Sequence, residues 1–174
     1  TFKVRNALHQ HPLTVTLYNV DRISDLKDSV CNTMPWWKDA VNSSKEIDVE
    51  AVLYSVSPRQ KYSDDLKIGD IDNRGLYHTR MDCVFVFKVK TAPAAIGTVE
   101  VFKVCMFDEG LMEIYVEAKA NSSTIHDLKG EIEKVMVMID LSGCEKRVTQ
   151  NGNVLSDDTM LNTLESHTVY ATLV

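Results

Sequence analysis

The chain has 174 residues, 44% of them apolar and 25% charged, which is the composition of a folded globular protein with one domain or two small ones. Its net charge of −6 argues against a general nucleic-acid binder, because a phosphate backbone attracts a surplus of Lys and Arg. No stretch approaches the ~18 consecutive apolar residues of a membrane span. We therefore expect a protein that binds neither nucleic acid nor membranes.

The first part of the chain predicts two strands, a helix and two further strands. Asp21 is a candidate cap for the helix. Ile23, Leu26 and Val30 follow it at the i, i+3, i+7 spacing that places side chains on one helical face. The expected strands, with a short helical segment before the last of them, occupy 1–8, 13–20, 47–56, 66–75 (the short helix) and 83–90.

The rest of the chain predicts the same order of elements. Ser123 or Thr124 is the candidate cap, and Ile125, Leu128 and Ile132 repeat the helical spacing. An Asn-Gly pair predicts a tight turn inside the third strand region. The expected strands and short helix occupy 98–106, 111–120, 145–155, 157–164 (the short helix) and 167–174.

Nearly the same five residues stand at the start of both helices, ISDLK at 23–27 and IHDLK at 125–129, 102 positions apart. Because the surrounding elements repeat as well, we predict two domains of about eighty residues, each with its own sheet wrapped around its own helix. The first covers residues 1–90 and the second 98–174. The small residues and the proline of the segment at 91–97 predict a linker.

Three segments of the second half carry a resemblance to a known family: STIHDLKGEIEK (123–134), RVTQNGNVLSDDTML (147–161) and HTVYATLV (167–174). They resemble the helix region, the third strand with its glycine turn and short helix, and the last strand of ubiquitin-like proteins. The first half resembles them more loosely, through RISDLKDSV (22–30) and its last strand. Its insertion at 32–46 departs from the family pattern. The resemblance implies an α+β fold of two tandem ubiquitin-like β-grasp domains, each β-β-α-β-β.

Tandem ubiquitin-like domains imply one of two functions. One is docking, in which the domains bind partner proteins. The other is conjugation as a modifier of the interferon- or inflammation-induced kind, which needs a terminal Gly-Gly. The given sequence ends at Val174, so we rank docking first and keep as the alternative a modifier whose diglycine tail follows Val174. Small-GTPase association modules of this shape use a basic second strand, and LTVTLYNV (13–20) carries no Lys or Arg.

In the second half, the resemblance places Thr149 and Thr172 at outward positions that are aliphatic in ubiquitin, with Tyr170 nearby. Two hydroxyls thus replace two apolar side chains of the patch that ubiquitin offers to its readers. We expect weak binding of ordinary ubiquitin readers, and we take these three residues as a candidate partner surface.

In the first half, the last strand is apolar on both faces, as VFVF (84–87) shows. If Val84 and Val86 point inward, Phe85 and Phe87 point outward and need a cover. That cover is either the chain's own PWW segment, a partner protein or the other domain. Trp36 and Trp37 raise the same question, since tryptophan is enriched at binding hot spots but also builds local cores. We include these four aromatic residues in the candidate partner-binding set.

No motif predicts catalysis, a cofactor or a metal ion. His9 and His11 flank Gln10 in the first hairpin and fit an ordinary polar turn better than a metal site. Cys31, Cys83, Cys105 and Cys144 form no C-x-x-C pair, and the first three lie in apolar segments. They predict buried free thiols in a reducing compartment, cytoplasmic or nuclear. We expect a non-enzymatic, monomeric protein-binding module.

Overall fold

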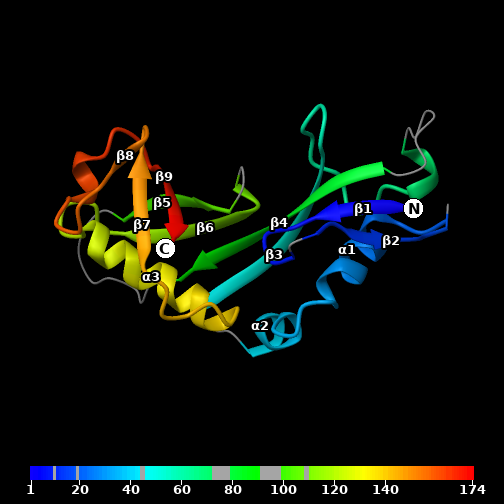
Figure 1. The fold of residues 1–174 in the computed structure, drawn as a ribbon, viewed down its shortest axis with the longest axis horizontal. Coiled ribbons are helices and arrows are strands. Elements are labelled where there is room, and N and C mark those ends of the chain that lie inside the picture. The colour runs from blue at the N-terminus through cyan, green and yellow to red at the C-terminus, as the bar shows by residue number, and fades with distance from the viewer. Residues whose placement is uncertain (10, 19, 44–45, 72–78, 91–98, 108–109) are drawn as a thin grey trace.

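The computed structural model describes all residues except 10, 19, 44–45, 72–78, 91–98 and 108–109, and it has an α+β fold (Figure 1). The expected linker at 91–97 lies outside the described residues. In the first half the elements are β1 (Phe2–Arg5), β2 (Leu13–Val15), α1 (Ile23–Cys31), α2 (Trp37–Ser43), β3 (Ile47–Ser55), a 3₁₀ turn (Ile68–Asp70) and β4 (Thr79–Val89). In the second half they are β5 (Glu100–Met106), β6 (Met112–Ala118), α3 (Ile125–Met138), β7 (Lys146–Gln150), β8 (Asn153–Val154), a 3₁₀ turn (Leu161–Thr163) and β9 (Thr168–Leu173).

Within each half the strand order is the same. In the first half β1 is flanked by β2, antiparallel, and by β4, parallel, and β3 pairs antiparallel with β4 on its far side. In the second half β5 is flanked by β6, antiparallel, and by β9, parallel, and β7 pairs antiparallel with β9. The first and last strands of each half are therefore parallel neighbours.

The two halves share one sheet, so the expectation of a separate sheet for each half is wrong. The cause is the length of β4. β1 covers only its first four residues, Thr79 to Asp82, and β6 pairs in parallel with the stretch from Phe85 to Val89 on the same side. Without β6, that stretch would leave backbone N–H and C=O groups unpaired at the centre of the molecule. Figure 1 shows β4 running from the first half into the second.

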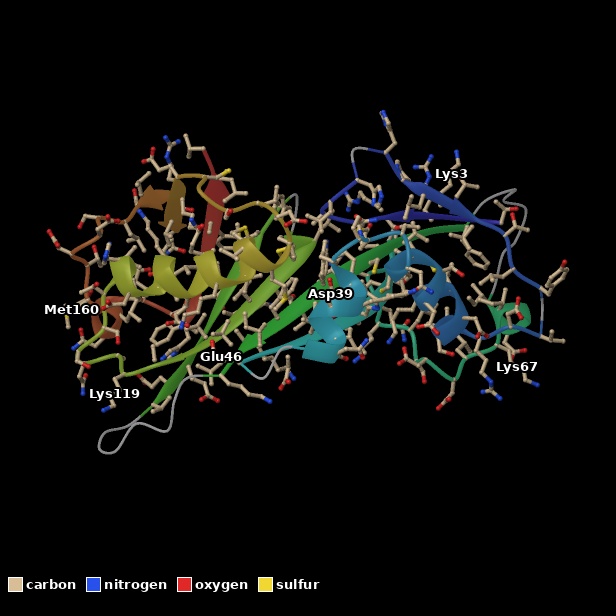
Figure 2. The ribbon with its side chains drawn as sticks, turned by 90° about the horizontal axis from the view of Figure 1, so that it is seen from below. Lys3, Asp39, Glu46, Lys67, Lys119 and Met160 are labelled. Atoms are coloured by element: carbon tan, nitrogen blue, oxygen red, sulfur yellow. The ribbon has the colours of Figure 1, made fainter. Side chains whose placement is uncertain are left out.

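The helices α1, α2 and α3 lie on one side of this sheet, and Figure 2 looks onto that side. The predicted helical stripes are confirmed as core. Ile23, Leu26 and Val30 are buried, as are the corresponding residues of α3. The buried side chains beneath the helices form one continuous cluster across both halves, rather than the two separate cores that the repeat predicts. This burial supplies the main driving force for folding.

The helix starts show which capping predictions hold. Thr124 caps α3, because its backbone N–H donates to Asp127 Oδ2 at 2.8 Å and its hydroxyl accepts from the Asp127 N–H. Asp21 does not cap α1. The helix begins after Arg22, whose N–H donates to Asp25 at 2.7 Å, while Asp21 accepts from the backbone N–H of Tyr18 in the preceding turn.

The lysine of the repeated pentapeptide makes the same contact in both halves. Lys27 donates to Asp64 at 2.8 Å, and Lys129 donates to Asp157 at 2.6 Å. Each aspartate also accepts from the backbone at the second helical residue, Ser24 or His126, through its own carbonyl oxygen. The repeated DLK thus has the same structural role in both halves. Its lysine ties each helix to an acidic loop that follows the third strand region.

Candidate functional site

The two phenylalanines of β4 are buried and do not form a partner surface. Phe85 and Phe87 are both 0% exposed, and they face the helix side of the sheet. Their cover is the chain's own segment: the ring centroid of Trp36 lies 5.4 Å from that of Phe85 and 5.9 Å from that of Phe87. Of the three covers considered from sequence, the PWW segment is therefore the one found, and assigning these phenylalanines to partner binding is wrong.

Both tryptophans belong to the same local packing. Trp36 is 7% exposed, and Trp37 is half-buried with its ring 5.8 Å from Phe85 and 5.9 Å from Trp36. Within the insertion at 32–46, residues Trp37–Ser43 form α2, so Trp36 stands just before that helix and Trp37 is its first residue. Adjacent residues at a helix start point in different directions, yet both rings lie against Phe85. The structure thus places Trp36 in the core rather than on a binding surface.

The face of β4 that we expected to point inward is the open face of the sheet. Val84 and Val86 lie on the side without helices, where they form a small apolar cluster with Val52. Tyr54 and Tyr115 pack against this cluster from neighbouring strands. One face of β4 is apolar because it packs under the helices, and the other because it packs against Val52 and the two tyrosines. The alternation of the sequence alone does not say which face meets the helices.

The three residues proposed on the second half lie together on this open face. Thr149 on β7 stands directly opposite Tyr170 on β9 in the ladder. Thr172 lies two residues further along β9, on the same side, opposite Arg147. Tyr170 is 54% exposed, Thr172 is exposed and Thr149 is half-buried. We call these three residues the Tyr170 surface.

A groove borders the Tyr170 surface where the two halves meet. It has a volume of about 720 Å³. One wall runs from Arg5, the last residue of β1, to His9, and the other is formed by β9 together with residues 105–107 and 110–111 at the ends of β5 and β6. The groove exists because β1 and β6 line the same side of β4 end to end, so the hairpins that follow β1 and precede β6 face each other. Tyr170, Thr172 and Cys105 lie along its second-half wall.

The first-half wall is fixed by a buried carboxylate. Asp82 on β4 is 1% exposed and accepts two hydrogen bonds from Arg5, at 2.9 and 3.0 Å, and one from Arg59, at 2.8 Å. Burial alone raises the pKa of Asp82, but the hydrogen bonds and charges of the two guanidiniums outweigh it and hold the pKa of this carboxyl below its ordinary value. Arg59 also stacks on Tyr54, its Cζ 4.7 Å from the ring centroid.

The turn beside Arg5 is held by Asn6, which is 3% exposed. Its Oδ1 accepts from the backbone N–H groups of Leu8, at 2.9 Å, and His9, at 3.1 Å. The His9 ring lies within hydrogen-bond distance of the same amide group. His9 therefore serves the turn, as an ordinary polar residue does, and His11 is exposed.

The groove does not have the chemistry of an activated nucleophile. Burial raises the pKa of the Cys105 thiol, and the nearby Lys103 lowers it only in part, so the neutral thiol prevails at pH 7. Cys31, Cys83 and Cys105 are buried free thiols, as predicted, and Cys144 is half-buried and free. Among the described residues, no three His, Cys, Asp or Glu side chains gather as a metal site, and no helix is long and apolar enough to cross a membrane.

Four residues of the groove and its first-half wall were not predicted as site residues from the sequence: Arg5, Asn6, Asp82 and Cys105. Arg5 and Asp82 are 77 positions apart, and nothing in either segment predicts their pairing. Cys105 was predicted as a buried free thiol, but nothing in its strand predicts that it lines a groove. Asn6 could have been predicted as a turn residue, because asparagine after a short strand is typical of a turn stabilised by its own side chain.

Comparison of the sequence with protein-family models and with curated proteins finds no match.

Proposed function

We propose that the chain is a non-catalytic protein-interaction module built of two ubiquitin-like β-grasp units, and that the Tyr170 surface with its adjoining groove holds a partner protein. The observation that carries the proposal is the exposure of Tyr170 at 54% on a sheet strand, next to two threonines and a groove of about 720 Å³. An aromatic ring with a hydroxyl offers both apolar area and a hydrogen bond, which is why tyrosine is enriched at interfaces.

The β-grasp part of the proposal is supported by strand order. In both halves the first and last strands are parallel neighbours, the second strand flanks the first, and the third flanks the last. The pairing of β4 with β6 joins the two halves, and this supports the docking proposal. It holds the first-half wall of the groove in a fixed position relative to the Tyr170 surface, which reduces the entropy lost on binding.

The alternative is a conjugated tandem modifier. Val174 is 60% exposed beyond β9, the position where the resemblance places a conjugation tail. The coding sequence downstream of Val174 decides between the two: Gly-Gly within about six positions favours the modifier, since only glycine lets the backbone approach an activating enzyme so closely.

Co-purification from cells of the source organism tests the docking proposal. The tagged chain is compared with Tyr170→Ala and with Tyr18→Ala, a matched control because Tyr18 is 80% exposed in the first half. We expect a stoichiometric partner that Tyr170→Ala loses and Tyr18→Ala retains. Equal recovery with all three proteins would overturn the assignment of the surface.

A further inference from the structure

The open face of the sheet carries a cluster of cations in the first half. β1 and β4 each send alternate side chains into the core beneath the helices, so the residues between these face the open side. The open-side residues are Lys3 and Arg5 on β1 and Arg80 and Asp82 on β4. In the ladder, Lys3 stands beside Arg80 and Arg5 beside Asp82. Arg59 reaches the same place from the segment after β3, because it donates to Asp82. Figure 2 labels Lys3 on β1.

A single acid faces these four cations. Asp82 is shared between Arg5 and Arg59, whose side chains remain 39% and 40% exposed. Lys3 and Arg80 are exposed, and neither forms an ion pair with a residue that the structure describes. With four cations and one acid, this surface has a net charge of +3, so the remainder of the chain, whose total is −6, carries −9. We call these five residues the Lys3 patch.

The pairing of Lys3 with Arg80 is unfavourable in the protein alone. Neighbouring strands lie about 5 Å apart, and like charges at paired positions destabilise a sheet. Both side chains are exposed, so the core does not depend on either charge. A bound anion would relieve this repulsion, because each cation would then have an opposite charge within reach.

The Lys3 patch is separated from the other acids of the open face. After Asp82, the open-side residues of β4 are Val84 and Val86, and the next acids in the described ladder, Glu50 and Glu113, stand opposite Val86. Four residues of a strand span about 13 Å. This exceeds the screening length of about 8 Å at physiological ionic strength, so these acids do little to neutralise the patch.

We propose that the Lys3 patch binds an acidic segment of a partner protein, in an extended conformation with Asp or Glu at alternate positions. Alternate residues of an extended segment lie about 6.7 Å apart, which is also the spacing of Lys3 and Arg5 along β1. A carboxylate can accept two hydrogen bonds at once from the Arg80 guanidinium and a further charged bond from the Lys3 ammonium. Arg5 also borders the groove, but the proposal does not depend on a partner at the Tyr170 surface.

A nucleic acid fits the Lys3 patch less well than an acidic peptide does. The phosphates of a nucleic acid continue beyond the few residues of the patch, and the remainder of the chain carries −9. A long polyanion would therefore be repelled outside the patch, whereas a short acidic segment ends within it.

Anisotropy titrations of the full chain test the proposal with three fluorescent probes. The first is a short peptide that alternates Asp with Ser, the second alternates Lys with Ser, and the third is a thymine oligonucleotide with as many charges as the first. The Asp/Ser peptide should bind most tightly. Its affinity should fall as the salt concentration rises, because exposed charges are screened.

Arg80→Glu should weaken binding of the Asp/Ser peptide by about fivefold or more, because one attraction becomes a repulsion. Lys3→Glu should act in the same direction. Lys38→Glu is the matched control, since it changes the net charge equally but lies exposed on α2, on the helix side. It should bind as the unmodified chain does, and so should Tyr170→Ala. Urea unfolding confirms that each variant is folded.

Several outcomes would overturn the proposal. These are binding undetectable at millimolar peptide, equal losses in Arg80→Glu and Lys38→Glu, and tighter binding of the oligonucleotide than of the Asp/Ser peptide. Loss of binding in Tyr170→Ala with none in Arg80→Glu would place the peptide in the groove instead. A dimer in sedimentation that Arg80→Glu abolishes would assign the patch to a second copy of this chain. The Tyr170 surface itself is decided by co-purification, so its failure is distinguishable from a failure here.

Discussion

Thr149 lies directly opposite Tyr170 on neighbouring strands of the open sheet face, and Thr172 follows on the same strand. A helix that binds ubiquitin by covering aliphatic side chains would find the hydroxyl groups of Thr149 and Thr172 at the corresponding positions of this chain. Each missing apolar contact is worth roughly 1.5–3 kcal/mol, so the affinity for a ubiquitin-binding helix should be low. We therefore expect this surface to differ in specificity from the corresponding patch of ubiquitin.

A gain-of-function variant tests this directly. Thr149→Ile combined with Thr172→Val should raise the affinity for a ubiquitin-binding helix by about tenfold or more, because both side chains become apolar. Isothermal titration of the chain and the double variant measures the change, with Thr14→Val on β2 as a control. Micromolar affinity of the unmodified chain would refute the expectation.

Removing the cover of β4 should destabilise the protein strongly. Trp36→Ala leaves a cavity over Phe85 and Phe87 and should lower the free energy of unfolding by about 3–5 kcal/mol. Trp37→Ala should cost less, because that ring is only half-buried. Urea denaturation followed by circular dichroism compares the two. If Trp36→Ala left the midpoint unchanged while removing a partner, the tryptophan would be a binding residue after all.

Because β4 and β6 are paired, a defect in the first half should reach the second. Trp36→Ala should speed hydrogen exchange of the β6 amides as well as those of β4, since the two strands share a ladder and one core. Exchange measured by NMR or mass spectrometry gives the comparison. Faster exchange confined to the first half would show that the halves unfold independently.

Among the charged residues, Asp82 should contribute strongly to the free energy of unfolding. Asp82→Asn leaves Arg5 and Arg59 without their carboxylate and should lower the free energy of unfolding by about 2 kcal/mol. This is less than the roughly 3–5 kcal/mol for fully buried pairs, because both guanidiniums retain some water. Asp28→Asn, a change at an exposed acid on α1, should have little effect in the same urea titration.

The same carboxylate predicts a pH dependence. The pKa of Asp82 is lower in the folded protein than its ordinary value of 3.8, so the unfolded chain takes up the proton first as pH falls. The stabilisation is therefore complete above the ordinary pKa and is lost as pH falls through the folded pKa. The stability difference between the chain and Asp82→Asn should shrink in acid below about pH 4. A constant difference down to pH 2 would contradict this assignment.

Local features were predictable from the sequence, and long-range ones were not. The apolar spacing in α1 and α3 predicts which side chains are buried, and the Asn151–Gly152 turn has the positive φ angles of 50° and 78° that its sequence predicts. These features depend only on neighbours a few residues away. A second repeat, Ser-Asp-Asp at 63–65 and 156–158, was visible and would have predicted the lysine contacts of both helices.

The joining of the halves depends on a difference in strand length. β1 ends at Arg5, where Asn6 turns the chain, and β4 continues for another seven residues past their last pair. Nothing local to β4 tells which strand fills the remaining edge. The orientation of Phe85 was also open, because a strand buried on both faces shows no alternation to orient it. Both errors concern partners distant in sequence.

Photo-crosslinking at position 172 tests the central claim most directly. A photoreactive amino acid replaces Thr172 in one protein and Thr14 in another; both threonines are exposed on strands, but Thr14 lies on β2 in the first half. We predict a discrete crosslinked partner from position 172 that is absent from position 14 and is lost when Tyr170→Ala is added. The same partner captured at both positions, or capture that persists with Tyr170→Ala, would contradict a docking role for this surface.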